Sequence, residues 1–376
     1  MVKYQRSNTM QQEGGGNLTA RSLIRSMVFL AVLILLCIPV LQSFQNNIPS
    51  NSSNTSSISA LQTKIRRLEY QTNMMQARRS NHSILGPISL QSLRPDQFAR
   101  FSDYNMTMRN PGSVSVYGIS QSQVPGIAHP YMTYLGPVDG WSKTWSAELV
   151  NTMVQAARQR QDISCQDYPQ SALQLYEALD RVQALDTSNL TRPWNILVAG
   201  SISPWVEAIV LGRAQEQENQ EKPSANPNVL QLYQNRIVTT DYNEIKSESP
   251  MIQFVSMESL EKHPPEPLFD MIVSYSSIEH DGLGRYGDPI NPEGDFCAME
   301  EYSLMLREGG WILLGVPVAG DPNIGVVDSN LHRLYSAARL ERLFQGFERA
   351  GEPITVPGLV DWQNQPVYLL RKGSIH

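Results

Sequence analysis

The chain has 376 residues, and 41% of them are hydrophobic, which is enough for one large core or two small ones. The net charge is −6 and no basic stripe follows the N-terminus, so the composition argues against a nucleic-acid partner. Three cysteines are too few for a disulfide framework. Cys37 lies in an apolar run, which leaves Cys165 and Cys297 as one bridge or as two ordinary thiols.

An apolar run near the N-terminus has the composition of a membrane anchor. No residue from 26 to 44 is charged, and a helix of about 20 such residues spans the hydrocarbon core of a bilayer. Basic residues outnumber acids in residues 1–25, which predicts a cytosolic tail and a luminal C-terminal part. A cleaved signal peptide is the alternative, but no Ala-x-Ala-like site follows the run. The sequence therefore predicts a single-pass type II membrane protein of the Golgi or endoplasmic reticulum.

Residues 45–93 are predicted to form a stem between the anchor and a domain at 94–376. The first part of the stem, 45–60, is rich in Asn and Ser and cannot bury a core. Residues 80–140 are rich in Pro, Gly, Ser and Tyr, and we expect an irregular arm that packs on the domain. Asn-x-Ser/Thr triplets beyond the anchor suit a glycosylated luminal chain, and they begin at Asn51, Asn54, Asn81, Asn105 and Asn189.

From Trp145 onward, apolar runs alternate with helical stretches. The expected elements are helices over 148–157 and 171–179, a strand over 195–199, a helix over 204–211, strands over 236–240, 251–255 and 269–274, a helix over 298–306, a strand over 310–316, a helix over 340–350 and a strand over 367–370. This alternation predicts βαβ units and an α/β fold with a doubly wound, mostly parallel sheet. The strands are nearly continuous apolar runs, as strands buried on both faces should be.

Ligands of a doubly wound sheet bind beyond the carboxyl ends of its strands, so the turns there are the candidate sites. After the first strand, the small residues Gly200, Ser201 and Ser203 would let a ligand approach the N-terminus of the next helix. Asp241, with Tyr242 beside it, ends the second strand, where a carboxylate can accept both hydroxyls of a ribose. An ordinary capped turn and a solvated acid would explain the same residues.

The turn after the strand at 269–274 is the most informative. It runs from Ser274 to Pro289 and contains three glycines, four charged residues and one histidine; these last five are Glu279, His280, Asp281, Arg285 and Asp288. His280 or Asp281 could remove a proton from a hydroxyl nucleophile, and Arg285 could clamp a polar or anionic group. A salt-bridged surface loop is the alternative.

A fourth polar stretch, 321–333, follows the strand at 310–316. Asn330, His332 and Arg333 could complete the same pocket, although loops are often polar without a function. His280, Asp281, Asp288 and His332 could instead hold a metal, but no spacing among them is diagnostic of a metal site. We expect the turns after 199, 240 and 274 to converge on one cavity along one rim of the sheet.

The long turn from Ser274 to Pro289, within the segment 269–318, resembles the domain-of-unknown-function family first defined from nematode proteins. The resemblance extends from about residue 194 to the C-terminus. More distantly, the order of elements is similar to class I S-adenosylmethionine-dependent methyltransferases. The matching motifs are Gly200-Ser-Ile-Ser203 for their Gly-rich loop, Asp241 for their ribose-binding acid, Phe269-Asp-Met-Ile followed by Glu279-His280, and Leu306-Arg-Glu-Gly-Gly310.

The second resemblance implies S-adenosylmethionine as the cofactor, bound by Gly200, Ser201, Ser203, Asp241, Tyr242 and Ser274. It implies catalytic roles in the polar turns for Glu279, His280, Asp281, Arg285, Asp288 and His332. Ser201 and Ser203 stand where further glycines are expected, so the loop is either altered or no longer binds the cofactor.

The leading hypothesis is a luminal methyltransferase that acts on a hydroxyl of a glycan or glycoconjugate. The choice of a glycan as the substrate rests only on the layout of anchor, stem and domain, which is common among Golgi enzymes. One alternative is a non-catalytic binding or scaffold module of the same fold. Another is a metal-independent glycosyltransferase, since no Asp-x-Asp motif occurs in the chain.

Overall fold

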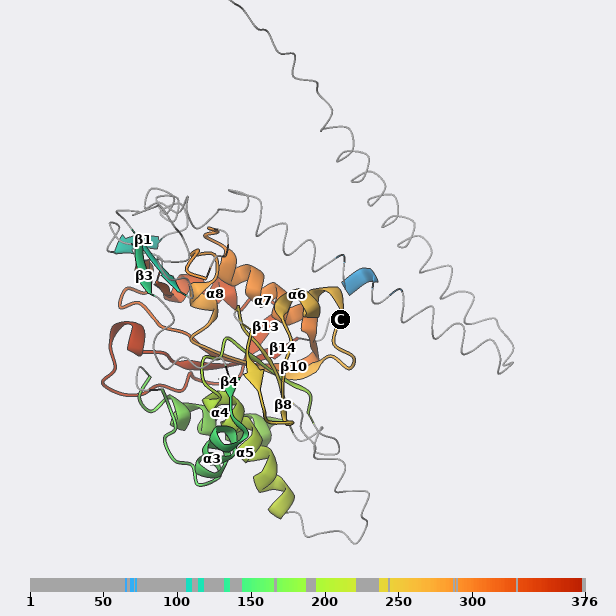
Figure 1. Cartoon of the computed structure of the whole chain (residues 1–376). Helices are drawn as coiled ribbons and strands as arrows, with labels where there is room; N and C mark the ends of the chain where they lie inside the picture. Colours follow the sequence, from blue (N-terminus) through green and yellow to red (C-terminus); the bar gives the residue numbers. More distant parts are fainter. Residues whose placement is uncertain are drawn as a thin grey trace, which may run out of the picture. The chain divides into compact units, whose positions relative to one another are not determined.

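A computed structural model gives the structure of the chain (Figure 1). It describes residues 65, 68–70, 72, 106–109, 114–117, 132–135, 144–165, 168–186, 194–220, 237–242, 244–286, 288, 290–328 and 331–373. The predicted anchor, the asparagines of the five glycosylation triplets and Asn330 lie outside these residues. Within the described ranges, no helix combines the length and the apolar character needed to cross a bilayer. The chain divides into two compact units, Met1–Glu69 and Tyr70–His376, and the described residues of the first unit are helical.

The second unit is built on a seven-stranded sheet with the order β13-β14-β10-β9-β5-β6-β8. The strands are β5 (Ile196–Ala199), β6 (Ile237–Thr240), β8 (Ile252–Phe254), β9 (Phe269–Tyr275), β10 (Leu306–Gly315), β13 (Phe347–Arg349) and β14 (Val367–Lys372). The pairs from β10 to β8 are parallel, whereas β14 runs antiparallel to both β10 and β13. The predicted α/β fold with a mostly parallel sheet is confirmed, with one reversed strand.

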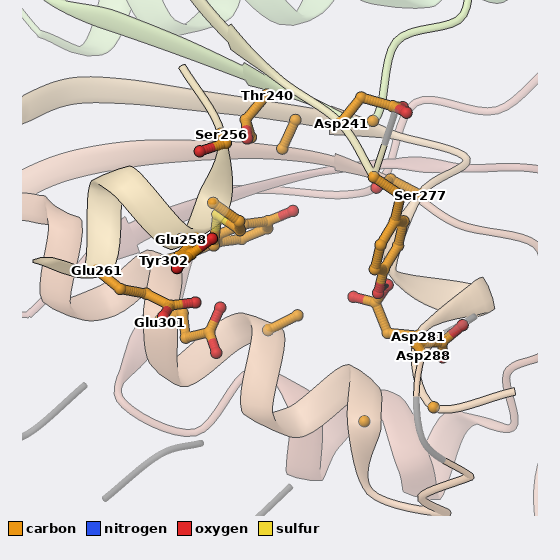
Figure 2. Close-up of a pocket in the computed structure, with 17 residues that line it drawn as sticks. Thr240, Asp241, Ser256, Glu258, Glu261, Ser277, Asp281, Asp288, Glu301 and Tyr302 are labelled. Atoms are coloured by element: carbon orange, nitrogen blue, oxygen red, sulfur yellow. Dashed lines mark hydrogen bonds between the residues drawn. The ribbon is translucent and has the colours of Figure 1, made fainter. Parts of the chain in front are cut away.

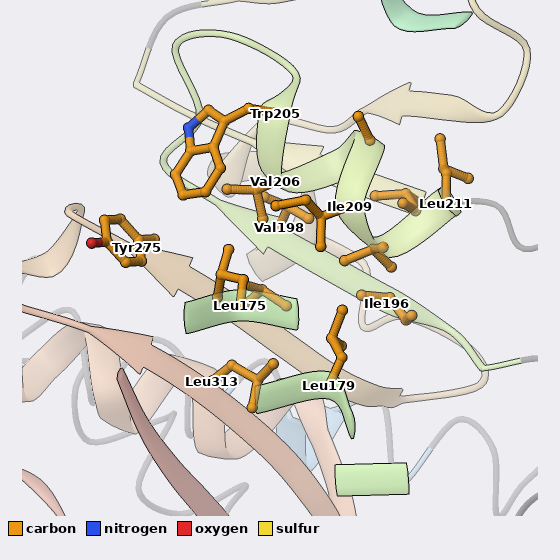
Figure 3. Close-up of a cluster of buried hydrophobic side chains, with 14 of the residues drawn as sticks. Leu175, Leu179, Ile196, Val198, Trp205, Val206, Ile209, Leu211, Tyr275 and Leu313 are labelled. Atoms are coloured by element: carbon orange, nitrogen blue, oxygen red, sulfur yellow. The ribbon is translucent and has the colours of Figure 1, made fainter. Parts of the chain in front are cut away.

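Helices cover both faces of this sheet. One face carries α3 (Ala147–Arg158), α4 (Ser171–Leu185) and α5 (Trp205–Gln220), and the other carries α6 (Met257–Lys262), α7 (Gly294–Met305) and α8 (Ala337–Leu343) (Figure 1). Alternate residues of β5 point to opposite faces, so Ile196 and Val198 pack under α4 and α5 (Figure 3) while Leu197 packs on the other side. This two-sided burial explains why the strands read as continuous apolar runs.

Three small sheets lie outside the main one. β1 (Met106–Arg109) pairs with β11 (Gly325–Asp328), which pairs with β12 (His332–Leu334); β2 (Val114–Tyr117) pairs with β3 (Met132–Leu135), and β4 (Thr144–Trp145) with β7 (Lys246–Ser247). The pairing of β1 with β11, strengthened by an Arg109–Asp328 ion pair of 2.6 Å, confirms that the arm packs on the domain. The arm and the stretch 321–333 are nevertheless not wholly irregular, because both contribute strands.

The helix predicted over 340–350 is wrong in its second half. α8 ends at Leu343, and Gly346 follows with a left-handed φ of +86°, which a helix cannot continue. The chain then returns as β13. Cys165 and Cys297 are both free thiols, so the bridge considered from the sequence does not form.

Candidate active site

Three turns at the carboxyl edge of the sheet meet at one cavity of about 430 Å³. Gly200 follows β5, Asp241 follows β6 and Ser277 follows β9, and all three line the cavity (Figure 2). The cavity lies where the strand order reverses, since β5 stands between β6 and β9. The predicted convergence of the three turns is therefore confirmed, and the volume is within the range of small-molecule sites.

The wall of this cavity is strongly acidic. Its carboxyl groups belong to Asp241, Glu258, Glu261, Asp281, Asp288 and Glu301. Figure 2 shows the three glutamates on one side and Asp281 and Asp288 on the opposite side. Among the described residues that line the cavity, none is Lys, Arg or His. A wall of this charge favours a positively charged ligand.

Thr240, the last residue of β6, adds a hydroxyl group to the cavity wall. Its side chain is buried, and Oγ1 has no hydrogen-bond partner in the described part of the chain. A buried hydroxyl without a partner is costly, so a bound ligand would be expected to satisfy it.

Gly200 shapes the first turn. Its φ of +75° lies in the left-handed region, and its N–H donates to the carbonyl oxygen of Thr240 at 2.9 Å, which ties the first turn to the second strand. A Cβ at this position would lie 2.1 Å from Ser277 Oγ. Only glycine therefore lets the first and third turns approach this closely.

Ser201 and Ser203, predicted to bind the cofactor, do not line the cavity. The Ser201 side chain is buried and turned inward, where its Oγ lies 2.9 Å from the Ser203 carbonyl oxygen and 3.0 Å from Glu207 Oε2. Glu207 Oε1 accepts a second hydrogen bond from Thr239 at 2.8 Å. Glu207, which was not predicted from the sequence, thus joins the first turn to β6 through its hydrogen bonds with Ser201 and Thr239.

Asp241 and Tyr242 both line the cavity, as predicted for the end of the second strand. The Tyr242 hydroxyl donates to Asp281 Oδ1 at 2.6 Å, and its ring stacks on Tyr286 with centroids 5.3 Å apart. Loss of solvation raises the pKa of Asp281 well above its usual range, and the hydrogen bond from Tyr242 opposes this shift. Asp288 accepts from the backbone N–H groups of Gly284 and Tyr286, so it also holds the turn.

The other predicted catalytic residues, Glu279, His280, Arg285 and His332, do not line the cavity. His280 Nδ1 donates to the carbonyl oxygen of Leu331, which also accepts from Arg285 Nη1 at 2.8 Å. Burial, together with the charge of Arg285, lowers the pKa of His280 well below its usual range, so the ring is neutral. Glu279 is buried, and the His332 ring lies 6.4 Å from the His280 ring.

Ser274, also predicted to bind the cofactor, is buried within β9 and does not line the cavity. Its Oγ lies 3.4 Å from the Tyr302 hydroxyl. The structure thus places Ser274 behind the wall, where it supports Tyr302.

A buried arginine clamps the third turn. Arg333 donates to the carbonyl oxygens of Glu279, Asp281 and Asn291 and does not line the cavity. Asp295 lies beside it as its counter-ion, at 3.9 Å from Arg333 Nε. Among the described residues, no group of three or more His, Cys, Asp or Glu side chains is arranged to hold a metal ion.

The glutamate side of the cavity was not predicted from the sequence. Glu258 and Glu261 come from α6, and Glu301 comes from α7 beside Tyr302. The rule on strand ends could have pointed to Glu258, because α6 begins directly after β8. Glu301 carries no comparable signal, since it lies in the middle of a helix.

Two buried glutamates should make the domain less stable as the pH rises. Burial raises the pKa of Glu207 and of Glu279 from 4.5 to about 7. Each folded carboxyl keeps a proton that the unfolded chain releases, so its contribution is complete below pH 4.5 and lost above about pH 7. We expect a loss on the order of 3 kcal/mol per group, measured by urea unfolding of the full-length chain at about pH 5 and about pH 8.

Replacing Glu207 with glutamine isolates one of the two groups, because the amide stays neutral throughout. The Glu207→Gln chain should lose less stability between the two pH values than the parent chain. A Glu308→Gln control, whose carboxyl is exposed at the amino end of β10, should lose as much as the parent. A Glu207→Gln chain with the pH dependence of the parent would count against this assignment.

Solved methyltransferase structures are similar to part of the chain. A 1,6-didemethyltoxoflavin-N1-methyltransferase from Burkholderia thailandensis, with bound 1,6-didemethyltoxoflavin and S-adenosylhomocysteine, is 16% identical; 61% of this chain and 88% of that chain are covered, with a TM-score of 0.33. The N-methyltransferase NodS from Bradyrhizobium japonicum WM9, in complex with S-adenosylhomocysteine, is 13% identical; 59% of this chain and 99% of that chain are covered, with a TM-score of 0.29. Values this low transfer neither an activity nor a ligand to this chain.

No curated protein matches the chain. Residues 194–352 match the family described as "Caenorhabditis protein of unknown function, DUF268", which confirms the resemblance drawn from the long turn after β9. The matched residues include all three turns and the described residues of the acidic cavity. This α/β part of the chain is thus the part that resembles DUF268.

Proposed function

We propose that the acidic cavity binds S-adenosylmethionine and that the protein transfers the methyl group to a hydroxyl of a glycan or glycoconjugate. The proposal of this cofactor rests on the cavity. The cavity lies at the switch point of the sheet, has Asp241 at the end of β6, and has no basic residue among the described residues of its wall. When bound, the cofactor supplies an electrophilic methyl group on a sulfonium ion.

The described residues fit this cofactor in charge and in shape. Its sulfonium and ammonium groups outnumber its one carboxylate, so its net charge is positive, and the carboxyl groups of the wall would offset that charge. Asp241 would accept hydrogen bonds from the ribose, and Gly200 leaves room beside the backbone. The serines of the first turn are no obstacle, because the Ser201 hydroxyl is turned away from the cavity toward Glu207.

The same wall argues against a nucleotide sugar in this cavity. A diphosphate would lie among six carboxyl groups, and those that are ionised would repel it, most strongly where solvent is excluded. The glycosyltransferase alternative is therefore less favourable than the methyltransferase. The scaffold alternative makes a different prediction, namely that the cavity has no measurable affinity for S-adenosylmethionine.

The hydroxyl acceptor, the membrane anchor and the luminal location are parts of the proposal that rest on the sequence. Residues 26–44 are uncharged, and the Asn-x-Ser/Thr triplets follow them. A full-length chain from a secretory cell that carried no N-linked glycan would contradict the luminal location.

Replacing Asp241 with alanine should weaken S-adenosylmethionine binding about 10- to 100-fold, since a hydrogen bond to a charged group contributes about 1.5–3 kcal/mol. Isothermal titration calorimetry on the full-length chain measures this change. Asp241 is partly exposed at a strand end, so the substitution should leave the unfolding transition nearly unchanged.

A Glu308→Ala chain is the matched control, because it removes an exposed carboxylate at the opposite edge of the sheet. Its affinity for S-adenosylmethionine should equal that of the parent. Absence of binding to the folded parent chain would sink the cofactor proposal and favour the scaffold alternative. Equal binding by the parent and by the Asp241→Ala chain would show that the cofactor does not bind in this cavity.

A further inference from the structure

A second polar cluster lies beside the acidic cavity, on the other side of the turn after β9. Its centre is Ser276, whose Oγ lies 2.7 Å from Glu279 Oε1 and 2.9 Å from the Tyr168 hydroxyl. The same Oγ accepts a hydrogen bond from Gln365 Nε2 at 3.2 Å. The cluster therefore joins the segment before α4, the turn after β9 and the segment before β14.

Two buried oxygen atoms of this cluster have no hydrogen-bond partner among the described residues. They are Oε2 of Glu279, whose residue is 1% exposed, and Oε1 of Gln365, whose residue is 3% exposed. Buried polar atoms are nearly always satisfied, so two such atoms in one cluster require an explanation. The Gln365 amide oxygen accepts hydrogen bonds, and so do both oxygens of Glu279 when it is ionised above about pH 7, which points to a ligand that donates them.

Half-buried aromatic rings surround the same cluster. The Tyr168 and Trp362 rings have centroids 5.9 Å apart, and the His332 and Trp362 centroids are 6.4 Å apart. All three residues are partly exposed. Aromatic faces of this kind bind the apolar side of a ligand whose other groups are polar.

The charge of the cluster differs from that of the cavity. Glu279 is accompanied by Arg285, whose charge lowers the pKa of Glu279 against the larger effect of burial. The neutral His280 ring lies between them, with Nε2 at 3.6 Å from Glu279 Oε1. Above about pH 7, where the Glu279 carboxyl is ionised, its charge and that of Arg285 balance each other, so the cluster suits a neutral ligand better than the six-carboxyl cavity does.

We propose that this cluster binds the methyl acceptor as a carbohydrate, whose hydroxyls donate to Glu279 and Gln365 while its C–H face packs on Trp362 and Tyr168. A sugar ring combines several donors with an apolar face, whereas an anion would bring acceptors toward Glu279. The inference rests on the proposed function and adds its acceptor site.

The cluster is close enough to the cavity for this role. Ser277 and Asp281 line the cavity, while Ser276 and Glu279 of the same turn belong to the cluster. A single turn therefore separates the two sites, and a ligand at the cluster would lie next to the β9 side of the cavity. Proximity of this kind is what a group transfer between two bound molecules requires.

Binding of the full-length chain to an array of immobilised oligosaccharides tests the inference, with permethylated copies of the same oligosaccharides as the matched ligand control. Without added cofactor, the parent chain should bind a subset of the native oligosaccharides and none of the permethylated copies, which cannot donate hydrogen bonds. The Glu279→Ala and Trp362→Ala chains should bind that subset at least about tenfold more weakly.

The affinity of these two variants for S-adenosylmethionine should stay within about twofold of the parent, which excludes simple unfolding. The Glu308→Ala control should bind sugar like the parent. The inference is overturned if no oligosaccharide binds, if permethylated copies bind equally, or if both variants bind like the parent. Sugar binding without S-adenosylmethionine binding would defeat the proposed function alone, and the reverse result would defeat this inference alone.

Discussion

Replacing Asp295 with alanine should lower the free energy of unfolding by about 3–5 kcal/mol, the usual cost of breaking a buried ion pair by removing one partner. The Asp295 carboxyl is fully buried and accepts from Arg339 Nε at 2.9 Å and from Arg339 Nη2 at 2.6 Å. Burial by itself would raise the pKa of Asp295, but Arg339 and Arg333 outweigh it and lower the pKa. Alanine would leave two buried guanidinium groups without their counter-ion. Chemical denaturation of the full-length chain measures the loss.

The matched control is Glu293→Ala, which removes the acid of an ion pair with Arg342 whose side chains are 34% and 50% exposed. Exposed pairs contribute about 0–1 kcal/mol, so this variant should be nearly as stable as the parent. The Asp295→Ala chain should also bind S-adenosylmethionine more weakly, because Arg333 holds the backbone of the third turn. Equal stability of the two variants would show that the buried pair does not hold the turn.

The parts of the site that follow strands could be predicted from the sequence. Asp241 and Asp281 were found because an apolar run predicts a buried strand, and parallel strands place their carboxyl ends at one edge. The acidic partners on α6 and α7 could not be found this way. α7 is buried on nearly all sides, so its sequence has no polar face from which the direction of Glu301 could be read.

Two of the four motifs that resemble those of methyltransferases have a structural role. Asp270 of Phe269-Asp-Met-Ile accepts from Arg307 Nε at 2.5 Å, and its other oxygen accepts from the Asn195 N–H at 2.8 Å. Arg307 belongs to the Leu306-Arg-Glu-Gly-Gly motif, so the two motifs form one ion pair at the amino ends of β9 and β10. This pair lies at the end of the strands away from the cavity. Such motifs can therefore indicate a fold without indicating whether a ligand is bound.

The reversed strand and the small sheets could not be predicted either. β14 is apolar in the same way as its parallel neighbours. A continuous apolar run does not indicate whether a strand is parallel or antiparallel to its neighbours. β11 and β12 are short strands that pair with each other, but β11 also pairs with β1, which lies more than two hundred residues earlier in the chain. Local periodicity contains no information about partners at that separation.

Replacing Gly200 with alanine should lower the free energy of unfolding by about 2–5 kcal/mol, combining left-handed strain with overpacking. The new Cβ would lie 2.1 Å from Ser277 Oγ and 2.4 Å from Ser277 Cβ. A change of rotamer moves Oγ but not Cβ, so the backbone of the first or third turn must shift. Because both turns line the cavity, S-adenosylmethionine binding should weaken with stability, and calorimetry and urea unfolding measure the two effects.

A Ser277→Gly substitution should rescue much of this loss. Without the serine side chain, the nearest Ser277 atom to the new Cβ is the Cα at 3.4 Å, an ordinary contact. The Gly200→Ala, Ser277→Gly chain should then keep only the left-handed strain, about 1–2 kcal/mol, so the two substitutions should be coupled by about 1–3 kcal/mol. Additive losses would mean that the two turns are not in contact. They would also contradict the shared cavity wall on which cofactor binding depends.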